Sequence, residues 1–330
     1  MISLFRDKSL ITIFVLALLT VLAHLHIFFH PMMVNNLCDN GYFSLFIQNY
    51  LVSVSPTVLS ILFIFIVFIQ AFLLNAVMDE WKMFQKSSYT IAAAYILITA
   101  CFPEFNCISA GLINNFLVIL FISLFERMYN NSKPNSLLFN IGFTISSSVF
   151  LFKPNVIFLI ISFLALAIIR PFRLREWLIL LIGIFVPVYL LGSILFLNDK
   201  FDFIRNSLPY FQLHRIVLTL SVWFWIKTSV LILSLLIGIN QWLPNYYRMV
   251  ISIRRNWIIL FLSIIILAFL PFGLYKGGFL DFLIILPLIA CFVSSVFLYP
   301  KRFLLPNFIF ILFIILIIHT NLLMSGIIKK

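Results

Sequence analysis

The sequence has few charged residues and few glycines for its length. Only 10% of its 330 residues are charged and 10 are glycine, whereas 64% are hydrophobic and the mean hydropathy is +1.18. Acidic residues are the scarcer charged type, with 10 Asp and Glu against 22 Lys and Arg. This composition excludes a soluble globular domain and predicts a protein that crosses a membrane several times.

The sequence also lacks the short motifs that carry nucleotide and hydrolase chemistry. It contains no Walker A loop, no Gly-x-Gly-x-x-Gly, no Gly-x-Ser-x-Gly and no His-Glu-x-x-His. Nucleotide-driven transport and hydrolysis therefore have no support, and no cofactor is expected. The net charge of +12 follows the ends of the apolar runs, so no nucleic-acid partner is expected either.

Long apolar runs predict an all-α fold, a polytopic transmembrane helical bundle. Without water in the bilayer core, the backbone must satisfy its own hydrogen bonds, and runs of about 20 apolar residues do so as helices. No stretch between runs is long enough for a separate domain, so residues 1–330 are predicted to form one integral membrane domain. The eleven predicted spans are 10–29, 57–78, 88–102, 108–125, 136–152, 155–170, 177–197, 216–239, 257–275, 279–299 and 303–323. Because only a tight turn separates the fifth and sixth runs, ten spans are the alternative.

The distribution of Lys and Arg predicts a cytoplasmic N-terminus, because basic residues are enriched in cytoplasmic loops. With that orientation, the inner segments hold about twice as many basic residues as the outer ones. The inner residues are Arg6, Lys8, Lys82, Lys86, Arg127, Lys133, Arg170, Arg173, Arg175, Arg248, Arg254, Arg255, Lys301 and Arg302. An odd number of spans would then place the C-terminus outside.

Histidines are predicted in the outer half of the molecule. These are His24, His26, His30, His214 and His319. The pattern indicates either a polar cavity that opens outward or side chains that reach the membrane interface. His26 and His30 are four residues apart, a spacing that suits two ligands of one metal ion, but no third ligand follows at a fixed spacing, and no metal site is predicted.

Three of the four cysteines, Cys38, Cys101 and Cys107, are predicted at the outer face, and Cys291 lies inside a span. Thiols at an outer face meet an oxidising compartment, which would allow a disulfide. Buried, reduced thiols are the alternative, and the sequence leaves both open.

One lysine, Lys227, interrupts the apolar stretch SVWFWIKTSV. If this span begins near residue 216, Lys227 lies about 16 Å deep, close to the middle of the bilayer. A cation at that depth faces the bundle interior, where it pairs with an acid or carbonyl groups or lines a wet cavity. Asp281 is the nearest candidate acid. The two interpretations are a packing role with carbonyl partners and a role in binding an anion or in gating.

Two outer segments are long enough to contribute to a site. Residues 30–55 carry Tyr42, Phe46 and Tyr50 on one helical face, which predicts an interfacial helix in the first outer loop. Residues 198–215 form the second. On the inner side, the turn RPFRLREW at residues 170–177 is explained by the positive-inside rule or by a site for phosphate or a partner protein.

That turn, together with FIQAFLLNAVM and PNVIFLIISFLALAIIRPF, resembles an uncharacterised family of bacterial polytopic inner-membrane proteins. The resemblance implies a multi-pass protein of the bacterial inner membrane and gives no catalytic residue. The outline of a cytoplasmic N-terminus, about ten spans and an acid in the first outer loop also resembles the glycosyltransferase C superfamily. The acid here is Asp39, but it is followed by Asn40, so the paired acidic motif common in that superfamily is absent.

Two classes of function stay open. The first is a non-enzymatic component of an envelope complex or a transporter, whose partners are the lipid bilayer and another envelope membrane protein. The second is a glycosyltransferase C-like enzyme that uses a polyprenyl-phosphate-linked sugar at the periplasmic face. In that enzyme, Asp39 would be the general base, and Arg205, His214, Arg215 and Lys227 would bind the substrate.

The enzyme hypothesis predicts a large effect of Asp39→Asn, which keeps the shape of the side chain and removes its basicity. General base catalysis contributes about 10²- to 10⁴-fold, so the rate of sugar transfer from a polyprenyl-phosphate donor should fall by at least that factor. An unchanged transfer rate in the variant would exclude Asp39 as the base.

Overall fold

The computed structural model describes residues 2–29, 50–51, 53–130, 134–199, 221–270, 279–300, 302 and 304–327. Within these residues the chain is helical and has no strand. The α-helices are α1 Ser3–Arg6, α2 Leu10–Ala23, α3 His26–Phe29, α5 Pro56–Glu80, α6 Thr90–Cys101, α7 Ala110–Asn130, α8 Asn135–Leu151, α9 Ile157–Ile169, α10 Leu174–Leu197, α12 Val222–Tyr246, α13 Ile251–Ala268, α15 Leu286–Leu298 and α16 Leu304–Met324. Three 3₁₀ helices join them: η1 Pro103–Phe105, η2 Lys153–Val156 and η3 Phe279–Ile285.

The all-α prediction is confirmed for the described residues, and the helices fall where the apolar runs predicted them. Seven of the helices are long and apolar enough to cross a membrane. Four shorter apolar segments, Leu10–Ala23, Thr90–Cys101, Asn135–Leu151 and Lys153–Ile169, match the remaining predicted runs. The protein is therefore a helical membrane protein, while the count of eleven spans stays a prediction.

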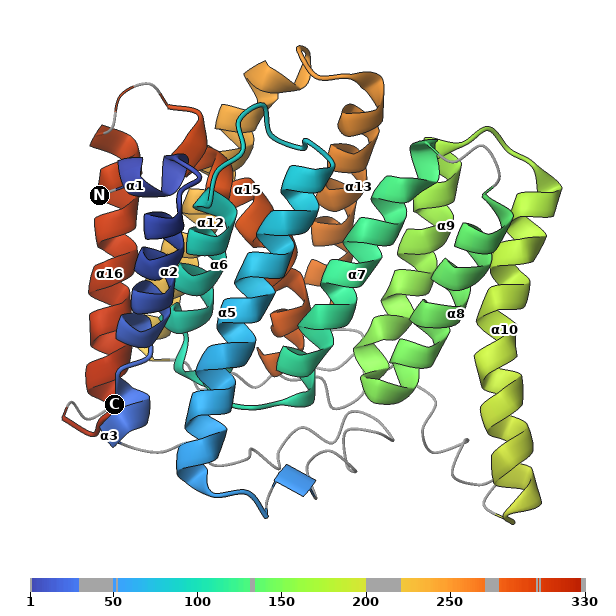
Figure 1. The fold of residues 1–330 in the computed structure, drawn as a ribbon, viewed down its shortest axis with the longest axis horizontal. Helices are drawn as coiled ribbons and strands as arrows, with labels where there is room; N and C mark the ends of the chain where they lie inside the picture. The colour runs from blue at the N-terminus through green and yellow to red at the C-terminus, as the bar shows by residue number, and fades with distance from the viewer. Residues whose placement is uncertain are drawn as a thin grey trace.

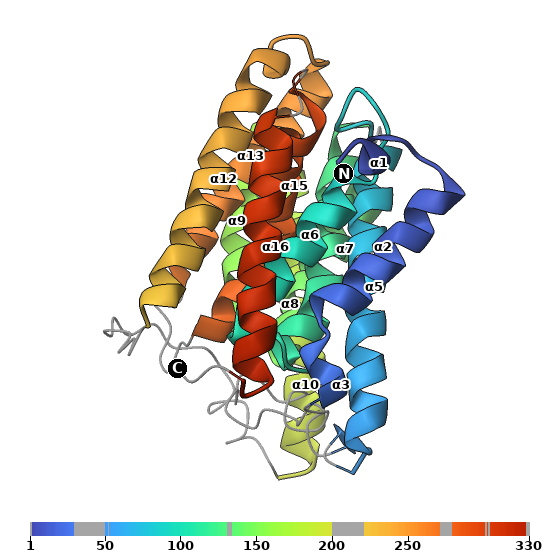
Figure 2. The same ribbon diagram turned by 90° about the vertical axis from the view of Figure 1, so that its left-hand side faces the viewer.

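Two short helices, α6 and α15, form the core of the bundle (Figures 1 and 2). Every residue of α6 is buried, and so are Leu286–Phe297 of α15. A helix that is apolar on all sides is stable only when other helices surround it. Here α5, α7, α12 and α16 pack around the pair, which explains why neither sequence shows an amphipathic pattern.

One end of the bundle, here called the basic end, is held together by cationic side chains. Arg6 donates to the carbonyls of Phe297 and Pro300 at 2.7 and 2.8 Å, and Lys8 pairs with Asp79 at 3.2 Å. Partial burial lowers the pKa of the Arg6 guanidinium from its ordinary value. The inner loops of the predicted topology thus meet at a single end, while the side of the membrane they face stays a prediction.

The opposite end contains all three 3₁₀ helices and the ends of α2, α6 and α16. η1 directly follows α6, and η3 contacts both η1 and the start of α7. Non-helical backbone at membrane depth is tolerated where protein surrounds it or where it lines a cavity. This end, here called the open end, is therefore where a site would be expected.

Two glycines allow α8 and α10 to approach closely at the edge of the bundle (Figure 1). A Cβ atom on Gly142 would lie 2.5 Å from the carbonyl oxygen of Leu180, and one on Gly183 would lie 2.5 Å from that of Phe139. Small residues at such crossings let the two backbones touch, which is the main source of helix association in lipid.

Gly183→Ala should therefore destabilise the protein by about 1–3 kcal/mol, because the added methyl group forces the two backbones apart. The matched control is Gly192→Ala on the same helix, where the residue is partly exposed. That change should be neutral or stabilising, because Ala has the higher helix propensity by about 1 kcal/mol. Thermal unfolding in detergent measures both, and equal effects would show that α8 and α10 do not pack through these glycines.

Candidate functional site

Lys227 is the sixth residue of α12, close to the open end. The helix begins at Val222, because the Ser221 side chain caps it by accepting a hydrogen bond from the Phe224 amide at 3.3 Å. At 1.5 Å per residue, Lys227 is about 8 Å from the first residue of the helix. The sequence placed the start near residue 216 and Lys227 near the middle of the bilayer. The structure places the residue on the second turn of α12, and its depth in the bilayer stays a prediction.

The side chain of Lys227 points into the bundle, as predicted. The residue is 3% exposed, and its ammonium donates to the Thr320 hydroxyl at 2.7 Å. The Thr320 hydroxyl in turn lies 2.7 Å from the carbonyl of Cys101 and 2.9 Å from that of Leu316, to which it can donate its single proton. The lysine, the threonine and the last carbonyl of α6 therefore form one chain of polar contacts.

The surroundings of Lys227 favour its positive charge but accept only part of its hydrogen bonds. Cys101 is the last residue of α6, and the negative end of the helix dipole favours a nearby cation. Glu104 also lies close enough to attract the ammonium. However, a lysine ammonium has three N–H donors, and within the described part of the chain only Thr320 accepts from one. Two buried donors thus remain for a ligand or water.

His319 adds a second polar group beside Lys227. Its ring stacks on Trp223 with centroids 3.8 Å apart, and the residue is 8% exposed. Neither ring nitrogen has a hydrogen-bond partner among the described residues. Both ring nitrogens therefore remain able to bind a polar group.

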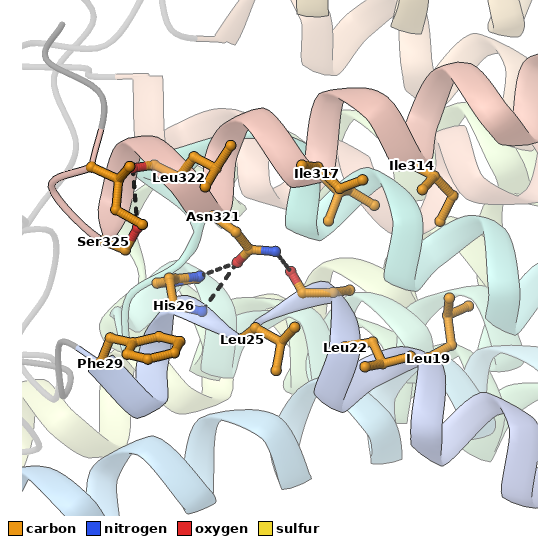
Figure 3. Close-up of a pocket in the computed structure, with 13 residues that line it drawn as sticks. Leu19, Leu22, Leu25, His26, Phe29, Ile314, Ile317, Asn321, Leu322 and Ser325 are labelled. Carbon is orange, nitrogen blue, oxygen red and sulfur yellow. Dashed lines mark hydrogen bonds between the residues drawn. The ribbon is translucent and has the colours of Figure 1, made fainter.

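Asn321 connects the same turn of α16 to α2 and α3 (Figure 3). Its side-chain oxygen accepts from the His26 amide at 3.2 Å and lies 2.7 Å from His26 Nδ1, which therefore carries the proton. Its side-chain nitrogen donates to the Ala23 carbonyl at 3.1 Å. The asparagine thus holds the end of α2 and the start of α3 against α16.

An apolar groove of about 390 Å³ runs between α2–α3 and α16 (Figure 3). Its polar side chains, His26, Asn321 and Ser325, lie toward the open end, and only leucine and isoleucine line it farther along α16. The residues that line it are Leu19, Leu22, Ala23, Leu25, His26, Phe29, Ile314, Ile317, Ile318, Asn321, Leu322, Ser325 and Ile327. The groove is therefore polar at one end and apolar at the other.

Three consecutive residues of α16, His319–Asn321, unite these features, and we call them the polar triplet. His319 faces Trp223 of α12, Thr320 faces Lys227 and α6, and Asn321 faces the groove. Successive helical residues point about 100° apart, so three neighbours in sequence reach three different helices. The buried ammonium and the groove therefore contact different faces of the same turn of α16, and of the triplet only Asn321 lines the groove.

The other predicted site residues, Asp39, Arg205, His214 and Arg215, lie outside the described residues, so their roles stay predictions. The same holds for Cys38, His30 and nearly all of the predicted interfacial helix. Cys101 and Cys291 are buried free thiols. No group of three potential metal-ligating side chains occurs within the described ranges.

The arginine turn is largely occupied by internal contacts. Arg170 pairs with Glu176 at 3.0 Å and donates to the Met128 carbonyl at 2.9 Å, while Arg173 lies 3.8 Å from the same glutamate. Glu176 is buried beneath them. These contacts favour a structural role for the turn, because Arg170 and Arg173 already share a carboxylate.

Sequence reasoning missed two buried polar networks around the start of α7. Tyr95 donates to Gln70 at 2.8 Å and accepts from Asn115 at 3.0 Å. Asn114 and Asn155 exchange side-chain hydrogen bonds of 2.9 and 2.6 Å. Two adjacent asparagines in an apolar run, Asn114 and Asn115, could have indicated these networks, since polar residues inside a membrane require partners.

Comparisons with known proteins give no further information on this site. No family model matches the chain, and neither the curated proteins nor the solved structures contain a match.

The incomplete hydrogen bonding of Lys227 predicts that its charge is not needed for stability. Lys227→Met keeps the length of the side chain and removes a buried ammonium without an ion-pair partner, so stability should be unchanged or higher. Thr320→Val keeps the shape of the side chain but leaves the ammonium without its acceptor, which should cost about 1–3 kcal/mol.

Thermal unfolding of the two purified variants in the same detergent gives the comparison. If Lys227→Met is destabilised as much as Thr320→Val, then the lysine serves to fix the end of α6, and no ligand is required to explain it.

Proposed function

We propose that this protein is a non-enzymatic component of a bacterial inner membrane that binds an amphiphile with an anionic headgroup at the open end of its bundle. The observation that carries the proposal is the polar triplet, which places a groove for a hydrocarbon chain beside a buried ammonium. A lipid that is transported and a lipid that regulates an envelope complex would both have this anionic headgroup and hydrocarbon chain.

The groove supports binding of a hydrocarbon chain. Ligand sites are concave, mostly apolar and equipped with a few convergent polar groups, and volumes of roughly 300–1,000 Å³ are typical. The groove of about 390 Å³ meets this description, and its polar groups are confined to one end. A molecule with a long apolar chain and a polar head matches that gradient.

Lys227 and His319 support an anionic headgroup. Both are buried, and together they offer the open ammonium donors and two imidazole nitrogens without partners. A phosphate has several oxygen acceptors and a negative charge, so it would satisfy these donors and compensate for burial of the cation. A neutral headgroup would satisfy the donors but give the ammonium no direct ion-pair partner.

The proposal assigns no reaction to this site. The glycosyltransferase C-like alternative uses a lipid of the same chemistry, but its general base would be Asp39, which lies outside the described residues. The sugar-transfer rate of Asp39→Asn distinguishes binding without transfer from binding followed by transfer.

Three probes test the proposal on the protein in phosphatidylcholine bilayers: dodecyl phosphate, dodecanol and inorganic phosphate. Dodecyl phosphate should raise the unfolding temperature most, because only it has both a hydrocarbon chain for the groove and a phosphate for Lys227. At 100 times its Kd, a ligand stabilises the folded state by about 2.7 kcal/mol. Lys227→Met should abolish the preference for dodecyl phosphate over dodecanol.

A matched pair of groove variants provides the control. Ile318 lines the groove and Ile315 does not, yet both are on α16 and both are 52% exposed. Ile318→Trp should fill the groove and remove stabilisation by both dodecyl compounds, whereas Ile315→Trp should leave it intact. Equal responses of the two variants, or a preference for dodecyl phosphate that survives Lys227→Met, would contradict the proposal.

A further inference from the structure

A second buried ionisable group lies near the basic end, far from the polar triplet. Glu126 on α7 is 3% exposed, and neither of its carboxylate oxygens has a hydrogen-bond partner among the described residues. The next residue, Arg127, pairs instead with Glu80 of α5. This burial was not predicted from the sequence, because Glu126 beside Arg127 is typical of a charged inner loop.

The carboxyl group of Glu126 lines a small cavity between α7, α9, α13 and α15. The cavity holds about 10 Å³, the space of about one water molecule. Asn256 and Ser263 of α13 line it as well, and the side-chain oxygen of Asn256 also lacks a partner. Ser263 donates its own proton to the Ile259 carbonyl at 2.7 Å, so its hydroxyl oxygen remains as an acceptor.

The atoms that lack a partner here have one property in common: both carboxyl oxygens of Glu126 and the side-chain oxygen of Asn256 are hydrogen-bond acceptors when the acid is ionised. A bare carboxylate in such surroundings is strongly disfavoured, because burial of an isolated ion costs far more than protonation of the group. A proton on Glu126 and one water in the cavity together give these atoms partners. The acid then donates to the water, and the water donates to Asn256 and to Ser263 or the second carboxyl oxygen.

We propose that Glu126 is a proton-binding site inside the bundle, at which a neutral carboxylic acid is bridged by one water to Asn256. The reaction is the loss of a single proton from the carboxyl group to water at the basic end, which leaves a carboxylate and changes no bond to carbon. The site is independent of the amphiphile site, because it lies near the other end of the molecule.

The charged and titratable groups around the site act in opposite directions. Glu80 of α5 is near enough to interact with Glu126 electrostatically, and its negative charge favours the protonated acid. The thiol of Cys291 on α15 also lies near Glu126. Three arginines lie on the same helices: Arg127 pairs with Glu80, Arg255 of α13 donates to the Ile169 carbonyl at 2.6 Å, and the guanidinium of Arg254 of α13 lies over the Tyr246 ring at 5.8 Å. The described residues of α8 and α9 contribute no titratable side chain.

Dicyclohexylcarbodiimide tests the proposal, because this apolar reagent modifies protonated carboxyl groups in membranes. The acid proton moves to one carbodiimide nitrogen, the carboxylate oxygen bonds to the central carbon, and an acyl shift gives a stable N-acylurea without a leaving group. Intact-mass and peptide analysis of the full protein should show one adduct at Glu126, and the labelling rate should fall as the pH is raised.

Variants and salts give the controls. Glu126→Gln should lose the adduct, whereas Glu80→Gln, at the exposed neighbouring acid, should keep it. Sodium chloride and choline chloride should give equal rates. Protection by sodium would show that a metal cation occupies the site and would overturn the proposal, as would an adduct that persists in Glu126→Gln or a wild-type protein without one.

Infrared spectroscopy keeps the proposal testable without any labelling. The wild-type protein should show the C=O stretching band of a protonated carboxyl group, and this band should be absent from Glu126→Gln. Asn256→Leu removes the acceptor of the bridging water and should shift the band to higher frequency. A spectrum without this band at neutral pH would contradict a protonated Glu126.

Discussion

The absence of hydrogen-bonding solvent in a bilayer is the constraint on which this structure depends. Each backbone and side-chain polar group must find its partner within the bundle, or it destabilises the fold. Helices satisfy the backbone, and contacts such as Tyr95 with Gln70 satisfy most buried side chains. Against this background, a buried polar group without a partner is informative, because something has to compensate for it.

Two sets of such groups, one near each end of the bundle, differ in polarity. At the open end, Lys227 and His319 offer donors and positive charge, which an anion complements. Near the basic end, Glu126 and Asn256 offer acceptors, which a proton and a water complement. The same physical rule therefore gives opposite ligands at the two ends of one bundle.

The sequence predicted the helices well, because their apolar runs result directly from the membrane environment. It also predicted that Lys227 faces the interior. It could not predict Thr320 as the partner, since 93 residues separate them and only packing brings α12 beside α16. The depth of Lys227 in the bilayer stays a prediction, while the structure places the residue on the second turn of α12. Glu126 was missed because adjacent charges look alike in a loop and in a buried helix end.

The central claim is that the Lys227 ammonium completes its hydrogen bonds with an anion. A density map of the protein in a lipid bilayer with dodecyl phosphate tests it most directly. The account predicts phosphate density within hydrogen-bond distance of Lys227 Nζ, continuous with chain density in the groove beside Ile318. An ammonium whose remaining donors are satisfied by the protein's own groups, with the groove empty, would contradict it.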